Sequence, residues 1–215
     1  METTDWASAL KPLLAKYKDR KHPLEYGNLY QLIVMVVLSA RDSDAHINKL
    51  APALFEAFPD MKALSKASVS ALEPYIGKVM SSDKKSEWLI DIAQNIGEDK
   101  NIPLSMKELT ALKGIGRKSA NVIMREAHVP AEGIMADLHV LRVVPRLGIT
   151  ADVDATKMEK QLMAILPQEM WSDIGMALSF LGREVCRPTN PKHSECVVSK
   201  VCEYCRVHNP GGCGS

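Results

Sequence analysis

The chain has 215 residues, of which 46% are hydrophobic, 25% are charged and only 5% are aromatic. This length and composition suit a globular protein with one substantial core or two small ones. The 27 Lys and Arg residues against 26 Asp and Glu give a formal charge of +1. That balance excludes a histone-like polycation and a polyanionic tail, but it allows a local basic face.

The longest apolar run, residues 29–40, is shorter than the roughly 20 residues that a bilayer span requires. No membrane helix is therefore expected. No cationic stretch leads into an apolar one near the start of the sequence, so no secretory signal is expected either. We expect a cytoplasmic protein, associated with the nucleoid if bacterial, whose reducing surroundings leave it without disulfides.

Hydrophobic periodicity predicts helices along most of the chain. The residues before Gly27 read as one amphipathic helix with a basic end. Residues 30–40, rich in Val and Ile, read as a central helix buried on all sides, because no partner strand is evident. Apolar residues at three- and four-residue spacing predict further helices over residues 67–76, 86–96, 119–127, 137–147, 154–166 and 171–184, with Asp154 as an N-cap. We therefore predict an all-α fold with two helical domains, one of residues 26–132 and one of residues 1–25 plus 133–215.

Residues 107–125 combine a helix corner with concentrated positive charge. Gly114 and Gly116 permit a tight reversal, and they leave backbone N–H groups at the start of the next helix open to a phosphate oxygen. An isolated Gly-x-Gly is more often an ordinary corner, so the neighbouring residues decide. The stretch has one acid, Glu108, against five cations, which favours a nucleic-acid backbone as partner: Lys107, Lys113, Arg117, Lys118 and Arg125.

The sequence LKGIGRKSANVI, the loop VPAEGIMAD and the helix that follows resemble the helix-hairpin-helix, Gly/Pro-rich loop and aspartate of a DNA glycosylase superfamily. LSARDSDAHIN is similar to the LSAQTTD-type segment of its endonuclease III branch, and the resemblance covers about residues 26–205. It implies that Lys118 is the catalytic lysine and Asp137 the catalytic aspartate. It also implies a base-excision-repair glycosylase with AP lyase activity on damaged pyrimidines, acting as a monomer on double-stranded DNA with a damaged base or abasic site.

The chemistry explains these two residue types. A carboxylate beneath the sugar stabilises the positive charge that develops as a base leaves C1′. A lysine amine that attacks C1′ forms an imine, from which β-elimination breaks the strand. An enzyme that uses water instead would be a monofunctional glycosylase for mispaired or alkylated bases. A non-catalytic DNA-binding iron–sulfur protein is the alternative from another class.

A target base must be flipped out of the duplex, and side chains must fill the space that it leaves. The resemblance assigns this role to Arg41, which replaces a glutamine usual in the family, and to Val79 or Met80. Arginine offers donors but no acceptor, so its contacts with the orphaned base would differ from those of glutamine. The other expected DNA contacts are Lys113, Gly114, Gly116, Arg117, Arg187 and Lys192.

All five cysteines lie at or after residue 186, which indicates ligands more than core residues. The family loop has the spacing C-x6-C-x2-C-x5-C and holds a [4Fe–4S] cluster. Cys186, Cys196 and Cys202 match its first, third and fourth positions, but His193 replaces the second. We expect His193 to be the fourth ligand; the alternatives are Cys205 in its place, loss of the cluster, or zinc. Cys213 is expected to be a free thiol.

Overall fold

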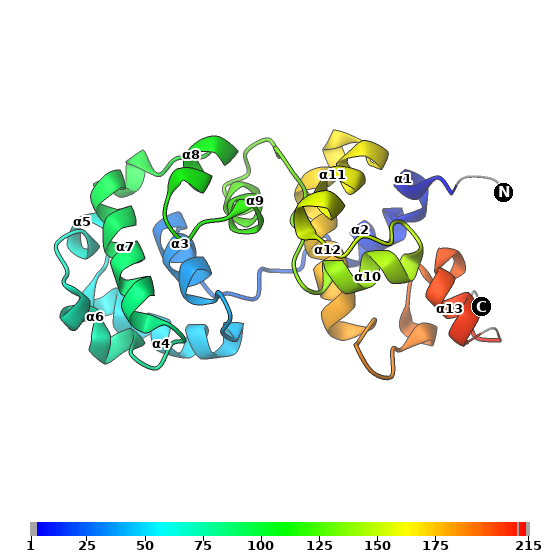
Figure 1. The fold of residues 1–215 in the computed structure, drawn as a ribbon, viewed down its shortest axis with the longest axis horizontal. Coiled ribbons are helices and arrows are strands. Elements are labelled where there is room, and N and C mark those ends of the chain that lie inside the picture. The colour runs from blue at the N-terminus through cyan, green and yellow to red at the C-terminus, as the bar shows by residue number, and fades with distance from the viewer. Residues whose placement is uncertain (1–3, 210, 214–215) are drawn as a thin grey trace. The chain divides into compact units, whose positions relative to one another are not determined.

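The computed structural model describes residues 4–209 and 211–213, and all regular elements in this part of the chain are helices (Figure 1). The predicted all-α fold is confirmed. The chain divides into two compact units. We call Lys21–Val129 the hairpin unit, and the described residues up to Arg20 together with those from Pro130 onward the tail unit. Among the described residues, no helix has the length and apolar character needed to cross a membrane.

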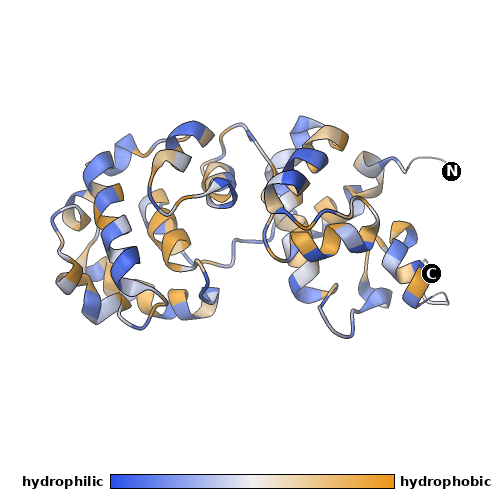
Figure 2. Ribbon diagram, viewed as in Figure 1, coloured by the Kyte–Doolittle hydropathy of each residue, from blue (hydrophilic) through white to orange (hydrophobic). Residues whose placement is uncertain are grey.

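The hairpin unit is built around α3 (Leu29–Leu38), which contacts α4, α7 and α9. Eight of its ten residues are buried, so the central helix expected from the Val- and Ile-rich run is confirmed. Figure 2 shows the apolar character of this helix against the more polar α7. The surrounding elements are α4 (Asp44–Ala57), α5 (Met61–Leu64), α6 (Val69–Ile76), α7 (Ser82–Ile96), a 3-10 turn (Asp99–Asn101), α8 (Met106–Ala111) and α9 (Arg117–Glu126).

The tail unit is organised by α12 (Trp171–Glu184), which contacts α2 and α10. A Cβ on Gly175 would lie 2.4 Å from the carbonyl oxygen of Met135, so only glycine allows α12 to approach the segment that precedes Asp137. The other elements are α1 (Trp6–Ala9), α2 (Lys11–Tyr17), α10 (Val140–Leu147), α11 (Ala155–Ile165), α13 (Glu203–His208) and 3-10 turns at Gln168–Met170, His193–Glu195 and Ser199–Val201.

At the helix ends, one sequence prediction is wrong and one is confirmed. The single N-terminal helix is wrong, because α1 ends at Ala9 and α2 ends at Tyr17. Pro12 lies in the first turn of α2, where its missing N–H costs no hydrogen bond, so it favours a new helix start. The predicted cap at Asp154 is confirmed, since its carboxylate accepts the N–H of Lys157 at 2.9 Å.

Candidate active site and cysteine-rich loop

The corner between α8 and α9 has the geometry of a phosphate-binding hairpin. Gly114 has a φ of +81°, and a Cβ there would lie 2.6 Å from the ring of Trp88. Both the backbone conformation and the lack of space therefore require glycine at this position. Ile115 is buried and anchors the loop. Gly116 begins α9 without a side-chain cap, and a Cβ there would meet nothing within 4 Å. The N-terminus of α9 is therefore open to an anion.

The cations predicted around this corner have different surroundings. Lys113 pairs with Asp91 of α7 at 3.0 Å, although its side chain is still 64% exposed. Arg117 and Lys118 lie exposed in the first turn of α9. The amine of Lys118 is thus accessible at the surface of the hairpin unit.

A group of polar residues that the sequence analysis did not single out lies in the same unit. His22, Tyr26 and Glu126 line a hollow of about 810 Å³. Burial lowers the pKa of His22 to about 4. Glu126 and Asp44 oppose this shift, while Lys118 and Arg125 act more weakly in the same direction as burial. Tyr26 donates a hydrogen bond to Glu126. His22 is therefore a neutral imidazole within electrostatic reach of the Lys118 amine.

Asp137 belongs to the tail unit and stands before the helix that it was expected to open. Its Oδ1 accepts the backbone N–H groups of His139 and Val140, both at 2.9 Å, so the carboxylate caps α10. Its Oδ2 accepts a hydrogen bond from the buried hydroxyl of Ser179 in α12, at 2.6 Å. These three bonds fix the orientation of the carboxylate. No motif in the sequence points to Ser179, because its role arises from a contact with Asp137, which is 42 positions away in the chain.

Arg41 and Met80 lie on two turns of the hairpin unit, at the C-terminal end of α3 and the N-terminal end of α7. Arg41 is exposed and has a φ of +62°. Met80 is 50% exposed, whereas Val79 is only 3% exposed and packs in the core. Of the two apolar residues predicted as a wedge, only Met80 is therefore accessible.

In the tail unit, the four residues at the family's ligand positions line one pocket: Cys186, His193, Cys196 and Cys202. None of the three cysteines is in a disulfide. Burial raises the pKa of the Cys196 and Cys202 thiols, and Cys186 acts in the same direction on both. Apolar residues of α10 and α12, among them Val143 and Leu181, also line the pocket.

The residues at the four ligand positions have the donor chemistry of an iron–sulfur site. In the described part of the chain, no three His, Cys, Asp or Glu side chains converge closely enough to hold one metal ion. Three thiols and an imidazole around one pocket provide the soft donors that an iron–sulfur cluster needs.

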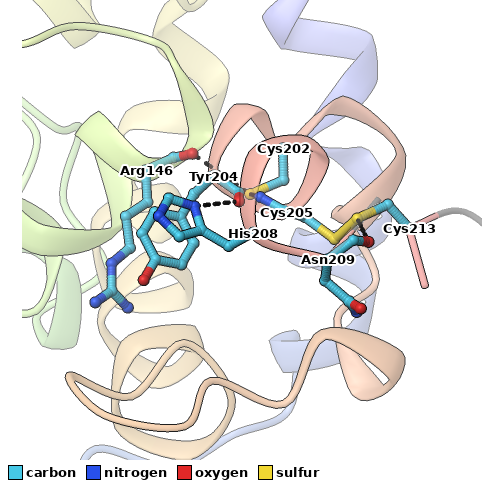
Figure 3. The surroundings of a disulfide bond; sticks show 7 residues. All are labelled: Arg146, Cys202, Tyr204, Cys205, His208, Asn209 and Cys213. Carbon is cyan, nitrogen blue, oxygen red and sulfur yellow. Dashed lines mark hydrogen bonds between the residues drawn. A yellow bond between two sulfur atoms is a disulfide. The ribbon is translucent and has the colours of Figure 1, made fainter. Parts of the chain in front are cut away.

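Arg146 of α10 fastens the cysteine-rich loop to the helix that Asp137 caps. Its guanidinium donates to the carbonyl oxygens of Arg187 and Pro188 at 2.7 and 3.0 Å. The guanidinium also lies 4.5 Å from the ring centroid of Tyr204, and the Arg146 carbonyl accepts the thiol of Cys202 at 3.4 Å (Figure 3). Arg187 itself is exposed, whereas Lys192 pairs with Glu195 at 3.0 Å.

The expectation that the chain has no disulfide is wrong, because Cys205 is bonded to Cys213 (Figure 3). Cys213 is therefore not a free thiol. A turn in which the N–H of Gly212 donates to the carbonyl of Asn209 returns the chain toward α13 and brings the two Cα atoms to 6.0 Å. That separation is within the range that a disulfide spans. Cys186, Cys196 and Cys202 are the free thiols in the described part of the chain.

Comparison with known proteins agrees with this geometry. Residues 34–168 match the model of the HhH-GPD superfamily of base excision DNA repair proteins. Endonuclease III of Synechocystis sp. is 34% identical over 83% of both chains, and that of Bacillus subtilis is 34% identical with the same coverage. A solved structure of a trapped endonuclease III–DNA covalent intermediate superimposes with a TM-score of 0.83 at 30% identity, over 94% of this chain and 97% of that one. The chain belongs to the HhH-GPD superfamily of base excision DNA repair proteins and, within it, to the endonuclease III family.

Proposed function

We propose that the chain is a bifunctional DNA N-glycosylase and AP lyase that removes damaged pyrimidines from double-stranded DNA. One observation carries the proposal. The amine of Lys118 is exposed in the first turn of α9, and the N-terminus of this helix is open to a phosphate. The related endonuclease III forms a covalent intermediate with DNA, and Lys118 is the residue that would form this bond here. Asp137, held by two N–H groups and Ser179, supplies the second catalytic group.

The lone pair of the Lys118 amine forms a bond to C1′ of the damaged nucleotide while the bond from C1′ to the base nitrogen breaks. The base leaves with the electron pair and takes up a proton. The negative charge of Asp137 stabilises the cationic sugar that develops in this step. Loss of the N–H proton with opening of the C1′–O4′ bond gives an imine, and removal of a C2′ proton then breaks the C3′–O bond.

The remaining DNA contacts position the substrate. The N-terminus of α9 and Arg117 hold the phosphate backbone, which gives affinity without reading the sequence. Arg41 and Met80 enter the space left by the flipped nucleotide. Arg187 is exposed on the cysteine-rich loop and adds a further phosphate contact. Lys113 and Lys192 contribute less than a free cation would, since each already has a carboxylate partner.

Cys186, Cys196, Cys202 and His193 hold a [4Fe–4S] cluster whose role is to order the loop. With three thiolates and a neutral imidazole, such a cluster in its 2+ state has a total charge of −1, against −2 with four thiolates. The loop sequence CRPTNPKHSEC is rich in proline and poor in apolar residues. It contributes little apolar core of its own, so metal binding supplies much of the free energy that folds it.

The nucleophile can be tested with Lys118→Gln. We expect the variant to lose borohydride trapping of a protein–DNA adduct completely, because the attacking amine is gone, while affinity for abasic DNA stays nearly unchanged. Lys113→Gln is the matched control, since it removes one charge from the same hairpin and should keep trapping. Trapping that persists in Lys118→Gln would move the nucleophile to another residue.

The role of Asp137 can be separated into charge and cap by two substitutions. Asp137→Asn keeps an oxygen that accepts the N–H groups of His139 and Val140, but it removes the charge. We expect base release to slow on the order of a hundredfold or more with little change in melting temperature. Asp137→Ala should slow base release as much and also destabilise the protein by about 1 kcal/mol. Single-turnover kinetics and thermal unfolding measure the two effects. If Asp137→Asn released the base as fast as the unmodified protein, Asp137 would serve only as a helix cap.

Exposure distinguishes Met80 from Val79. Met80→Ala should weaken binding to abasic DNA while leaving the free energy of unfolding unchanged, because its side chain is half exposed. Val79→Ala removes buried methyl groups and should destabilise the protein by about 2 kcal/mol. Denaturant unfolding and binding titrations of both variants check this pair, and the opposite pattern would assign the wedge to Val79.

Ligation by His193 can be tested through the cluster itself. The purified protein should contain about four irons per chain. His193→Cys should keep the cluster and lower its reduction potential, because another thiolate adds negative charge at the iron, whereas His193→Ala should give a labile or three-iron centre. Iron analysis, EPR and potentiometry measure these outcomes.

Cys205→Ser is the control for His193, because it breaks the disulfide without touching the four proposed ligands. The cluster should survive in this variant. If the cluster is lost in Cys205→Ser and kept in His193→Ala, Cys205 is the fourth ligand. Stoichiometric zinc, or no metal after anaerobic purification, would contradict both assignments.

A further inference from the structure

The corner of the phosphate-binding hairpin lies against the side chain of Trp88, which belongs to α7. A Cβ on Gly114 would lie 2.6 Å from Cε3, 3.1 Å from Cδ2 and 3.2 Å from Cζ3 of Trp88. All three atoms belong to the six-membered ring of the indole, so this ring packs directly against the backbone at Gly114. No motif in the sequence points to Trp88, because the contact joins α7 to a corner that comes later in the chain.

Helix α7 provides a fixed base for the Trp88 ring. Six of its residues are buried, among them Leu89 and Ile92, so the helix is held in the core of the hairpin unit. Trp88 itself is half-buried and lies at the margin of this buried face. The ring therefore reaches the hairpin from a helix that cannot easily move with it.

Two charged residues lie on the same side of α7 as Trp88, one turn before it and one turn after it. The Nζ atom of Lys84 lies 5.2 Å from the centroid of the Trp88 ring, a cation–π contact that restrains the indole. The carboxylate of Asp91 pairs with Lys113 at 3.0 Å. Helix α7 thus contacts two successive residues of the hairpin corner, Lys113 through an ion pair and Gly114 through the ring.

Of these two contacts, the one with Trp88 is the stronger restraint on the backbone of the corner. The Lys113 side chain is 64% exposed, and exposed ion pairs contribute little to stability. Ile115 holds the corner through its buried side chain, whereas Gly114 can be held only through its backbone, since it has no side chain. Glycine also has the largest conformational freedom to lose. A large flat ring against its backbone removes much of that freedom.

We propose that Trp88 is a positioning residue whose ring supports Gly114 and thereby holds the hairpin in its DNA-binding conformation before DNA arrives. The inference rests on the proposed function, because it concerns how the hairpin binds DNA. A hairpin that is already ordered avoids the entropy cost of becoming ordered when the phosphate binds. Without the ring, the backbone at Gly114 adopts several conformations, and DNA binding must first select one of them.

The test compares Trp88→Ala with Trp88→Phe and with Trp6→Ala as control. Because Cδ2 and Cε3 lie close to the stem of the tryptophan side chain, a phenylalanine ring keeps part of the contact with Gly114. Trp6 is a half-buried tryptophan of α1 in the tail unit, so Trp6→Ala removes the same side chain away from the hairpin. Affinity is titrated on a duplex with a tetrahydrofuran abasic-site analogue. The rate of borohydride trapping is measured with saturating protein on a natural abasic site.

Fixing one flexible residue in a single backbone conformation lowers an equilibrium constant roughly tenfold. Trp88→Ala should therefore weaken binding to the analogue about tenfold, while the trapping rate of the saturated complex stays nearly unchanged. Trp88→Phe should restore most of the affinity, and Trp6→Ala should bind as the unmodified protein does. If Trp88→Ala does not fold, Trp88→Leu replaces it with the same expectations, because leucine keeps apolar volume without a flat ring.

A double-mutant cycle with Gly114→Ala tests the contact itself. In the unmodified protein, Gly114→Ala brings a methyl group into the Trp88 ring and also strains a backbone with a φ of +81°. In the Trp88→Ala background only the strain remains. The fold-loss of affinity caused by Gly114→Ala should therefore be several times smaller in that background.

Unchanged affinity in Trp88→Ala would overturn the inference, as would equal losses from Gly114→Ala in the two backgrounds. A fall in the trapping rate as large as the fall in affinity, together with a lower melting temperature, would also overturn it, because that pattern indicates general structural damage. These failures are distinct from failure of the proposed function. In the latter case the unmodified protein itself would form no borohydride-trapped adduct.

Discussion

Because α3 is apolar on nearly every face, it is stable in water only when other helices surround it. In the hairpin unit α4, α7 and α9 do so. Around this core, helices end at the rim of the unit, where their backbone groups lack partners within the helix. The N-terminus of α9 offers N–H groups to a phosphate, and the C-terminus of α3 offers carbonyls that Lys85 takes up. The packing of one apolar helix thus places the phosphate hairpin and the turn after α3 that carries Arg41.

The sequence predicts the helices well where one stripe of apolar residues recurs over several turns. Trp171–Glu184 matches its prediction at both ends, and α3 differs by no more than two residues. The periodicity does not single out α4, whose interior contains Pro52 and whose first turn lies in a segment read for its motif. The N-terminal helix fails for a related reason: helical spacing continues past Leu10, but Pro12 favours a new start there. A single proline is thus a weak signal for a helix boundary when the apolar pattern around it continues with helical spacing.

The residues of the candidate site are of two kinds. Some are recognisable from local sequence motifs, and others take part only through contacts between distant parts of the chain. Lys118, Asp137 and the loop cysteines stand in motifs with characteristic spacing, so their residue types alone indicate chemistry. The partner of Asp137 does not, because Ser179 reaches its carboxylate only after the helices pack. Burial is also a tertiary property, which is why the sequence offers both Val79 and Met80 as a wedge and the structure exposes one. The disulfide at Cys205 depends likewise on a turn that composition does not reveal.

The contacts of Arg146 give the cysteine-rich loop a second role, which is to hold the C-terminal end of α10 in place. Helix α10 has eight residues and is about 12 Å long, with Arg146 in its last turn and Asp137 capping its first. Residues of the loop bond to both the guanidinium and the carbonyl of Arg146, so the loop restrains the C-terminal end of α10. The N-terminal end of the same helix orients the Asp137 carboxylate. A chain truncated before Cys186 loses this restraint together with the loop. Order in the loop is thereby transmitted to a residue some fifty positions earlier in the chain, and a chain that lacks the loop has a loosely held Asp137.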